Sequence, residues 1–417
     1  MVPNGWKLGK ISDLANTKMG YAFKSSDFVS SGIPLLRMGN LYQNSLDFSR
    51  NPAFLPFSYE KDYENFVVKP NDLVMSMTGT MGKRDYGFTV QIPEDAPISL
   101  LNQRVMKFIA KKDISSGYLM YVLRSEALLN KLYSFPGGTK QANLSADQVK
   151  EISVLIPSFE EQNKIAQILS TWDQAISATE KLLENSQQQK KALMQQLLTG
   201  NKRLLDENGV NFSEGWNEYS LGNLGNTFTG LTGKTKDDFG SGVPYITYMN
   251  IFKNSRIDIN QVDYVVVKED ENQNSVRYGD IFFTTSSETA DEVGMSSVLL
   301  EEVERLYLNS FCFGFRLNNF KVLLPQFAAY ILRSSNIRKQ ISILGQGATR
   351  YNLSKNQLMK LILRLPTIAE QKKIAEVLYL ADQEIETLKK KLDCLKQEKK
   401  ALMQQLLTGK KRVKVAA

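Results

Sequence analysis

Two long stretches of the chain carry apolar residues at alternating steps of four and three. One follows Pro157 and the other follows Pro366, and neither contains a glycine or a further proline before Gly200 and Gly409. Good helix formers fill both stretches, so each predicts a helix of about 40 residues. The sustained heptad spacing is typical of a coiled-coil seam. The predicted seam positions are Ile165, Leu169, Trp172, Ile176, Thr179, Leu183, Ser186, Lys190, Leu193 and Leu197, and then Ile374, Leu378, Ala381, Ile385, Leu388, Leu392, Leu395, Lys399, Leu402 and Leu406.

Shorter apolar runs precede each long stretch and occur in matching pairs. Gly32–Leu41 is matched by Gly242–Ile251, and Asn71–Ser76 is matched by Gly279–Thr284. These runs are bounded by Gly, Pro, Asn or Asp, which favours short buried strands. The region before each long helix is therefore predicted to be rich in strands.

The chain is an internal repeat. Lys190–Gly200 returns letter for letter at Lys399–Gly409, and Tyr-x-Leu-Arg-Ser occurs at 121–125 and again at 330–334. A repeat this long is not the period of a solenoid. It indicates two homologous halves, each ending in a long helix that the glycine caps.

These patterns predict an α/β (α+β) chain with two homologous strand-rich domains, separated by two long antiparallel coiled-coil helices and related by a pseudo-two-fold axis. We expect the helices to be antiparallel because a globular domain separates them along the chain. The alternative is two separate helices that each dock on a partner protein. The expected boundaries are residues 1–156 for the first domain, 157–200 for the first helix, 201–365 for the second domain, 366–409 for the second helix and 410–417 for a basic tail.

Composition narrows the possible functions. The net charge is +8 and the pI is about 9.1, which permits a polyanionic partner such as nucleic acid. The chain has no histidine and two cysteines, Cys312 and Cys394, so a histidine-based triad, a histidine-ligated zinc site and a disulfide framework are excluded. We see no signal segment and no apolar run of about 18 residues, so we expect a cytoplasmic protein without a membrane span.

Several of these features resemble the specificity subunit of Type I restriction-modification enzymes. The most specific are the repeated Lys190–Gly200 sequence and the two helix openings, at 157–166 and 366–375, which each contain Glu-Gln-x-Lys-Ile-Ala. Arg37–Asn40 and the loop Thr78–Lys83 are also similar to the family. The resemblance covers nearly the whole chain.

The resemblance implies a protein without catalytic activity of its own. It implies double-stranded DNA, two DNA methyltransferase subunits and two translocating nuclease subunits as partners. It also implies that each target-recognition domain reads one half of an asymmetric bipartite site, while the helices set the gap. Cofactors would then bind the partners: S-adenosylmethionine in the methyltransferase, and ATP and Mg in the nuclease.

Candidate DNA contacts come from residue types that reach bases and phosphates. The loop after one predicted strand, Thr78–Lys83 with Arg84, combines glycines, hydroxyls and two cations, although it could be a plain solvated hairpin. Its counterpart, Thr284–Thr289, keeps hydroxyls but lacks the lysine. Further candidates come from a basic turn in each half and from two strand ends. The full set of candidates is Arg37, Asn40, Thr78, Gly79, Thr80, Lys83, Arg84, Thr139, Lys140, Gln141, Tyr248, Asn250, Thr285, Ser286, Ser287, Thr349, Arg350 and Tyr351.

Other motifs are given structural interpretations. The Asn-Leu-Ser sequences that follow the basic turns are expected to cap helices. The Glu-Gln openings are expected to be exposed first-turn charges that suit partner docking. Lys190 and Lys399 lie on the seam, where lysine extends its ammonium group outward, and are assigned no function.

Two motifs that are similar to catalytic sequences are incomplete. Asn51–Phe54 has alanine at the third position of an adenine-methyltransferase motif, and Gly230–Thr235 lacks the first glycine of a phosphate-binding loop, where Phe228 stands. The chain is therefore expected to be a non-catalytic specificity subunit. The alternative function is a helical-spacer scaffold that pairs two protein partners without reading DNA.

Overall fold

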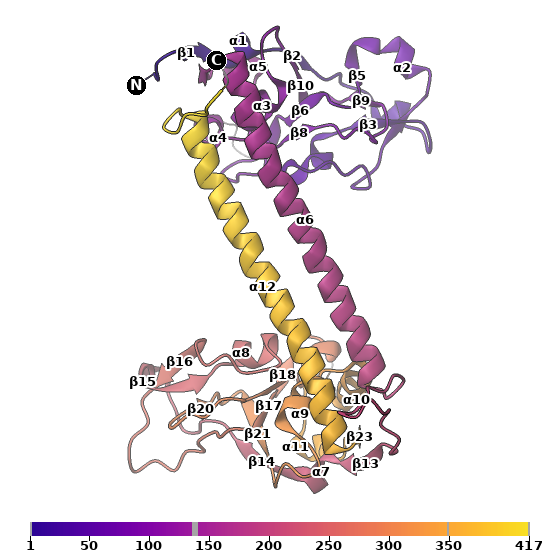
Figure 1. Cartoon of the computed structure of the whole chain (residues 1–417), viewed down its shortest axis with the longest axis vertical. Coiled ribbons are helices and arrows are strands. Elements are labelled where there is room, and N and C mark those ends of the chain that lie inside the picture. Colours follow the sequence, from indigo (N-terminus) through magenta and orange to yellow (C-terminus); the bar gives the residue numbers. More distant parts are fainter. Residues whose placement is uncertain (1, 136–140, 348–349, 416–417) are drawn as a thin grey trace. The chain divides into compact units, whose positions relative to one another are not determined.

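The computed structural model describes residues 2–135, 141–347 and 350–415 (Figure 1). The chain divides into two compact units: unit 1 comprises Met1–Glu180 and Lys390–Ala417, and unit 2 comprises Lys181–Lys389. Two long helices, α6 (Phe159–Leu197) and α12 (Ile368–Leu407), each contribute residues to both units. The predicted α/β (α+β) class, with two strand-rich domains and long helices, is confirmed.

Unit 1 is built on two four-stranded sheets. The first is antiparallel with the order β2-β10-β6-β8, and the second has the order β4-β3-β9-β5 with β3 parallel to β9. Strand β1 pairs with β12, which comes just before α6 along the chain. The strands are β1 (Lys7–Lys10), β2 (Ala15–Met19), β3 (Ile33–Leu36), β4 (Phe54–Leu55), β5 (Val67–Val68), β6 (Leu73–Ser76), β8 (Thr89–Gln91), β9 (Ser99–Leu101), β10 (Val105–Ala110) and β12 (Ser153–Ile156).

Short helices pack between the first sheet of unit 1 and the long helices. The largest hydrophobic cluster of the unit joins Met75 of β6 and Tyr118 of α3 to Leu169 of α6 and Leu406 of α12. The long helices thus share a core with the strands. These short helices are α1 (Ile11–Leu14), α3 (Ser116–Leu123), α4 (Glu126–Ser134) and α5 (Ala146–Lys150), whereas α2 (Tyr59–Asp62) packs against the second sheet.

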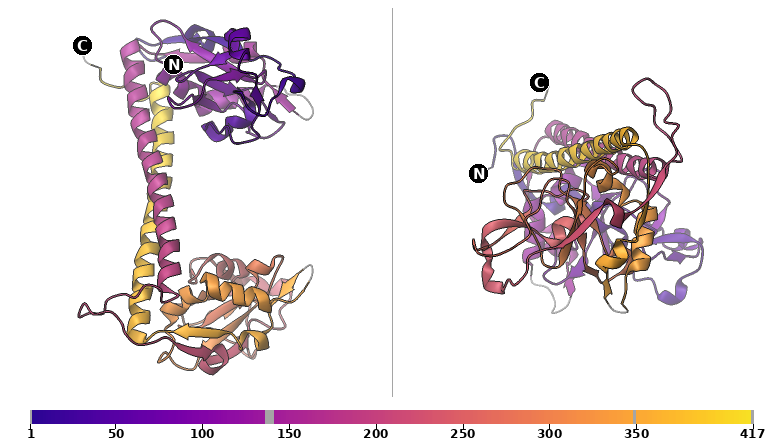
Figure 2. Two further views of the ribbon diagram at one scale, coloured as in Figure 1. Left: turned by 90° about the vertical axis from the view of Figure 1, so that its right-hand side faces the viewer. Right: turned by 90° about the horizontal axis from the view of Figure 1, so that it is seen from below.

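Unit 2 repeats this plan. Its main sheet has the order β14-β21-β17-β19, β13 pairs with β23, and a three-stranded sheet has the order β16-β15-β20. In each unit the long helices run along one side of the strands (Figure 2). The elements are β13 (Asn217–Ser220), α7 (Leu221–Leu224), β14 (Gly225–Thr229), β15 (Phe239–Ile246), α8 (Tyr248–Lys253), β16 (Val262–Val265), β17 (Ile281–Thr284), β19 (Ser296–Val298), β20 (Tyr307–Leu308), β21 (Cys312–Leu317), α9 (Pro325–Ile331), α10 (Ser335–Leu344), α11 (Lys355–Leu358) and β23 (Ile362–Leu365).

The caps of the long helices match the sequence signals. Ser158 and Thr367 accept the backbone N–H groups of the third helical residues, as N-cap side chains do. Past the other ends, Gly200 and Gly409 adopt φ angles of 74° and 68°, which favour glycine. The predicted C-terminal glycine caps are confirmed.

The predicted seam also appears in the burial of the two helices. Every predicted seam position is buried or half-buried, whereas most of the residues between them are exposed. Within unit 1, Asp173 and Glu180 of α6 pair with Lys399 and Lys396 of α12, so the paired segments run antiparallel. Within unit 2, Ser186 and Lys190 of α6 also pair with α12, and these segments are antiparallel as well.

The tyrosine, the arginine and the serine of the repeated Tyr-x-Leu-Arg-Ser sequence each make a different structural contact. In unit 2, the Tyr330 hydroxyl bonds Asp382 of α12, Arg333 donates to backbone carbonyls that include Ser296 and Ile251, and Ser334 caps α10. Burial lowers the pKa of Arg333 to about 10. The motif therefore ties the helix pair, the loops and the next helix of the unit together.

The predicted strands were too long at one place in each half. β3 ends at Leu36 and β15 ends at Ile246, and the residues that follow form a 3-10 turn (Met38–Asn40) and α8 (Tyr248–Lys253). By contrast, β6 and β17 lie within the predicted runs and are buried throughout. None of the described helices is both long and apolar enough to cross a membrane.

Candidate nucleic-acid interface

Each unit contains a two-stranded antiparallel ribbon built from two of the predicted contact segments. In unit 1, β7 (Thr78–Thr80) pairs with β11 (Gln141–Asn143). In unit 2, β18 (Ser286–Ser287) pairs with β22 (Tyr351–Asn352). We call these pairs ribbon 1 and ribbon 2. The sequence predicted the four segments separately, and the fold brings them together two by two.

Ribbon 1 presents cations, a hydroxyl and an amide along one exposed edge. Thr80 lies opposite Gln141 in the ribbon, and both are exposed. The loop that follows β7 exposes Lys83 and Arg84. The Arg84 guanidinium lies 5.2 Å from the centre of the Tyr133 ring, which holds it against the unit. These are the side chains expected of a surface that contacts bases and phosphates.

The loop of ribbon 1 is held by Asp85. The backbone N–H of Thr80 donates to Asp85 Oδ1 at 2.8 Å. Burial opposes ionisation of Asp85, but the hydrogen bonds from Thr80 outweigh it and lower the Asp85 pKa. A Cβ atom at Gly79 would lie 2.3 Å from Asp85 Oδ1 and 2.7 Å from the Tyr86 ring. Glycine is therefore required at position 79.

A basic residue that the sequence did not indicate completes ribbon 1. An Arg104 NH group donates to Asn143 Oδ1 at 2.7 Å and reaches Thr78 Oγ1 at 3.5 Å. Thr78 itself is 4% exposed and donates its hydroxyl to Asn143, so it supports the ribbon and is removed from the candidate contacts. Arg104 belongs to none of the motifs identified in the sequence, and only the fold places it beside the ribbon.

Ribbon 2 carries different side chains on the same scaffold. Tyr248 donates its hydroxyl to the backbone carbonyl of Ser286 at 2.8 Å, and burial raises the Tyr248 pKa. Thr285 and Ser286 are half-buried, and Arg350 is exposed. Tyr351 is half-buried and packs on the hydrophobic core of the unit. The available donors are fewer than in ribbon 1.

Three further candidates are corrected because they are used inside the fold. Asn40 and Asn250 are each 2% exposed and donate their amides to backbone carbonyls of the loops that follow them. Ser287 is 7% exposed, and its hydroxyl bonds Glu292. We assign these three side chains structural roles instead of DNA contacts.

The remaining candidates fall into two groups. Arg37 is half-buried and donates to the backbone carbonyl of Asn51, so its guanidinium is engaged in its own loop. Thr139, Lys140 and Thr349 lie outside the described residues.

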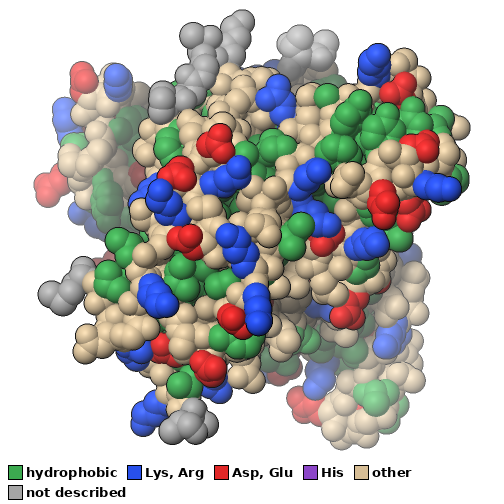
Figure 3. Space-filling model, turned by 90° about the horizontal axis from the view of Figure 1, so that it is seen from above, with side chains coloured by type: hydrophobic (Ala, Val, Ile, Leu, Met, Phe, Trp, Pro, Cys, Tyr) green, Lys and Arg blue, Asp and Glu red, His purple; other side chains and the backbone are tan. Residues whose placement is uncertain are grey.

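On the coloured part of the face shown in Figure 3, Lys and Arg side chains are interspersed with Asp and Glu. A single basic patch therefore does not mark the interface on that face.

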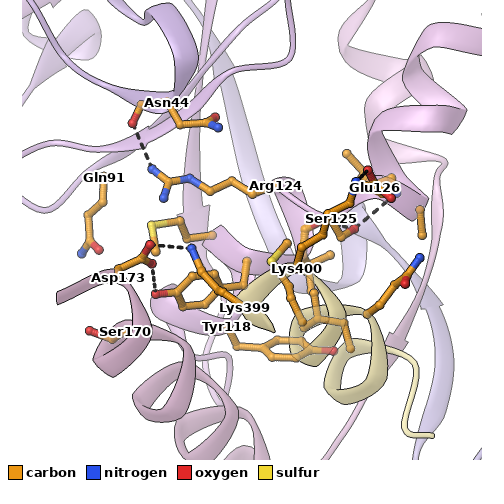
Figure 4. A pocket seen from close by; sticks show the side chains of 18 of the residues that line it. Asn44, Gln91, Tyr118, Arg124, Ser125, Glu126, Ser170, Asp173, Lys399 and Lys400 are labelled. Carbon is orange, nitrogen blue, oxygen red and sulfur yellow. Dashed lines mark hydrogen bonds and ion pairs between the residues drawn. The ribbon is translucent and has the colours of Figure 1, made fainter. Parts of the chain in front are cut away.

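The seam lysines have partners, contrary to the expectation that they extend outward. Lys399 of α12 lies 2.5 Å from Asp173 of α6 (Figure 4). Tyr121 donates its hydroxyl to the same carboxylate at 2.7 Å. Burial, and then the bond to Asp173, raises the Tyr121 pKa, so the phenol stays a donor. These side chains line a cavity of about 1110 Å³ in unit 1. Lys190, Asp382 and Tyr330 repeat the arrangement in unit 2.

The glutamates of the Glu-Gln openings are also buried, which corrects the expectation of exposed charges. Glu370 is fully buried and accepts two bonds from Arg203, at 2.6 and 2.7 Å. In unit 1, Glu161 is 5% exposed and accepts from Trp6 and Arg412. Each arginine follows the C-terminal glycine cap of one long helix and binds the start of the other.

A comparison with protein families finds the same family in both halves of the chain. The family model for the Type I restriction modification DNA specificity domain matches residues 3–186 and 213–397. The chain belongs to this family. The two matches correspond to the two halves of the internal repeat, so the family domain occurs twice.

Relatives agree with that membership, and a solved structure has the same fold. The MjaVIII specificity subunit of Methanocaldococcus jannaschii is 30% identical over 210 residues, but the match spans only 50% of this chain and 48% of that protein. The EcoBI specificity subunit of Escherichia coli is 25% identical, over 89% of this chain and 78% of that protein. The crystal structure of the S subunit from M. genitalium has the same fold, with a TM-score of 0.58, 16% identity and 98% of each chain covered.

Proposed function

We propose that this chain is the DNA specificity subunit of a Type I restriction-modification complex, and that each unit reads one half of an asymmetric bipartite site. The observation that carries the proposal is the pair of ribbons. Each ribbon joins polar loops that are far apart in sequence, and the two ribbons stand on the same scaffold. Membership of the DNA specificity family supports it in both halves.

The chemistry of the ribbons supports unlike half-sites. Ribbon 1 offers Lys83 and Arg84 with the Gln141 amide, whereas ribbon 2 offers Arg350 with hydroxyls. Arginine and lysine recognise guanine, and glutamine recognises adenine, in the major groove. Because the two surfaces differ, their preferred base sequences differ as well.

We further propose that α6 and α12 set the gap between the half-sites. Helices of 39 and 40 residues are roughly 60 Å long. This length suits two readers one to two turns apart on B-DNA, where they would meet the same face of the duplex. Lengthening both helices by one or two turns should therefore change the gap and leave each half-site sequence unchanged.

Catalysis is proposed to belong to partner proteins in the cytoplasm. We infer that the helix pair docks two DNA methyltransferase subunits, which use S-adenosylmethionine to methylate adenine, and that two nuclease subunits use ATP and Mg. Leu182, Tyr379 and Leu380 on the long helices are exposed apolar side chains that suit such docking. No step of the chemistry is assigned to this chain.

The test is selection of a duplex library by this chain bound to its methyltransferase partner. Enrichment of one asymmetric bipartite sequence, with N6-methyladenine at the same sequence in the host genome, supports the proposal. Affinity should fall steeply with salt, because phosphate contacts release counterions. Absence of any selected sequence at low salt would favour the alternative, a scaffold that pairs proteins without reading DNA.

A further inference from the structure

A tight turn lies beside each ribbon, at the same place in the two units. In unit 1 the turn Asn102–Val105 is closed by the Val105 N–H, which donates to the Asn102 carbonyl at 2.9 Å. In unit 2 the turn Asn309–Cys312 is closed by the equivalent bond, at 3.1 Å. Each turn leads directly into the central strand β10 or β21 of its sheet.

The third residue of each turn is tied to the ribbon by the same backbone bond. The Arg104 carbonyl accepts from the Met77 N–H at 2.9 Å, and the Phe311 carbonyl accepts from the Thr285 N–H at 3.2 Å. Met77 and Thr285 directly precede the ribbon strands β7 and β18. Arg104 and Phe311 therefore occupy one equivalent position, with a guanidinium in unit 1 and a phenyl ring in unit 2.

The glycine beneath each turn supports this equivalence. A Cβ atom at Gly20 would lie 2.0 Å from the Asn102 carbonyl oxygen, and one at Gly230 would lie 2.1 Å from the Asn309 carbonyl oxygen. Both turns thus rest directly on backbone that only glycine allows. The two turns have the same construction and differ in the side chain that they present.

Phe311 is exposed to an unusual extent for its size. It is 67% exposed, more than any other aromatic side chain of unit 2 among the residues that the structure describes. A single exposed apolar residue is common on protein surfaces and carries no argument alone. Here the residue is bonded to half-buried Thr285, which directly precedes ribbon 2, at the position where unit 1 has a cation.

We propose that positions 104 and 311 determine base preference, with Arg104 recognising guanine and Phe311 making an apolar contact to the methyl group of thymine. This inference rests on the proposed function. The Arg104 guanidinium is fixed by Asn143 and Thr78, which leaves its other N–H groups to the O6 and N7 acceptors of guanine. A phenyl ring offers no hydrogen bond, and the thymine methyl is the apolar feature of the major groove.

The experiment uses the full chain with its methyltransferase partner and the duplex selected by the wild type. Each thymine of the site is replaced in turn by uracil, which lacks only the methyl group. We expect one replacement to weaken wild-type binding by about fourfold, the effect of one buried methyl group. The same replacement should have no effect on Phe311→Ala. Phe57→Ala removes a 71% exposed ring in unit 1 and should retain the wild-type response.

Arg104→Ala tests the other half of the proposal. It should reduce discrimination at one guanine of the opposite half-site by roughly 5- to 150-fold, the range for one bidentate base contact. Phe311→Arg should shift one position of its half-site from thymine toward guanine. If wild-type chain selects a bipartite site and these variants keep every base preference, positions 104 and 311 do not specify bases. If the wild type selects no sequence, the proposed function fails first.

Discussion

Arg203 and Glu370 join the segment after α6 to the first turn of α12, and the variant Arg203→Met tests what this ion pair contributes to unit 2. The Glu370 side chain is fully buried, and the Arg203 side chain is 24% exposed. Two parallel bonds of 2.6 and 2.7 Å connect the guanidinium to both carboxylate oxygens. This bidentate geometry is the strongest form of charge-assisted hydrogen bond between side chains.

The expected cost of Arg203→Met is about 3–5 kcal/mol of unfolding free energy in unit 2, because the variant leaves a buried carboxylate without its partner. Arg364→Met is the matched control in the same unit. Arg364 and Glu218 are 4.0 Å apart, and their side chains are 63% and 67% exposed. An exposed pair of this kind contributes about 0–1 kcal/mol.

The double variant Arg203→Met with Glu370→Met separates the two causes of the loss. It removes the buried charge together with its partner, so we expect much of the lost stability to return. Because a chain of two units need not unfold in one step, stability is measured by native-state hydrogen exchange in peptides of each unit. Unit 1 should retain wild-type protection in all three variants.

If Arg203→Met costs no more than Arg364→Met, the buried ion pair does not stabilise unit 2 as expected. That result would mean that the Glu370 carboxylate finds water or other donors as soon as its partner is removed. A loss that persists in full in the double variant would instead assign the effect to packing of the Arg203 side chain.

Three further predictions concern ribbon 1, the thiols and the seam. Gly79→Ala should displace ribbon 1 and weaken recognition of one half-site at least tenfold in duplex binding. Gly39→Ala is the control, because a Cβ atom there meets nothing within 4 Å, and it should bind like the wild type. Burial raises the pKa of Cys312 to about 12, so Ellman's reagent at pH 8 should titrate only the exposed Cys394 in the native chain and both thiols after unfolding. Lys399→Met should lower the stability of unit 1 by about 1 kcal/mol, because its aspartate partner is partly exposed. Unchanged hydrogen-exchange rates in α12 would contradict this prediction.

The long helices and their ends could be predicted because their signals are local. Seam burial follows from heptad spacing alone, and Gly200 and Gly409 end their helices by the conformational freedom of glycine. Neither prediction needs knowledge of distant residues. The same holds for β6 and β17, which are short apolar runs bounded by polar residues.

The ribbons could not be predicted as pairs. Thr78 and Asn143 are 65 residues apart and meet only because the sheet and the short helices between them fold back. Local pattern indicates that each segment is polar and turn-rich, but it carries no information on register. Arg104 was missed for the same reason.

The wrong assignments share a different cause. Asn40, Asn250 and Glu370 are polar residues that sequence reasoning placed at the surface, and all three are buried. A buried amide or carboxylate is stable when its hydrogen bonds are satisfied. Whether the partners exist depends on loop carbonyls and on an arginine far away in sequence, so residue type alone cannot decide burial.

The internal repeat itself separates folding from recognition. Residues that the two halves share, such as the tyrosine and arginine of Tyr-x-Leu-Arg-Ser and the glutamate of each helix opening, are used inside the units. Residues that differ between the halves include the exposed pair Arg104 and Phe311, which flank the ribbons. The ribbon strands also differ at Gly79 and Ser287 and at Ala142 and Tyr351, positions that are buried or half-buried.

This division has a consequence for how specificity can change. Because Arg104 and Phe311 contribute a backbone carbonyl to the ribbon and a side chain to the surface, exchanging these side chains leaves the backbone bond in place. Exchange at Gly79 is different, since a side chain there collides with Asp85. Base preference should therefore be adjustable at Phe311 without loss of stability. A change at Arg104 also removes its side-chain bonds to Asn143 and Thr78, and the ribbon strand tolerates only changes that its own loop accommodates.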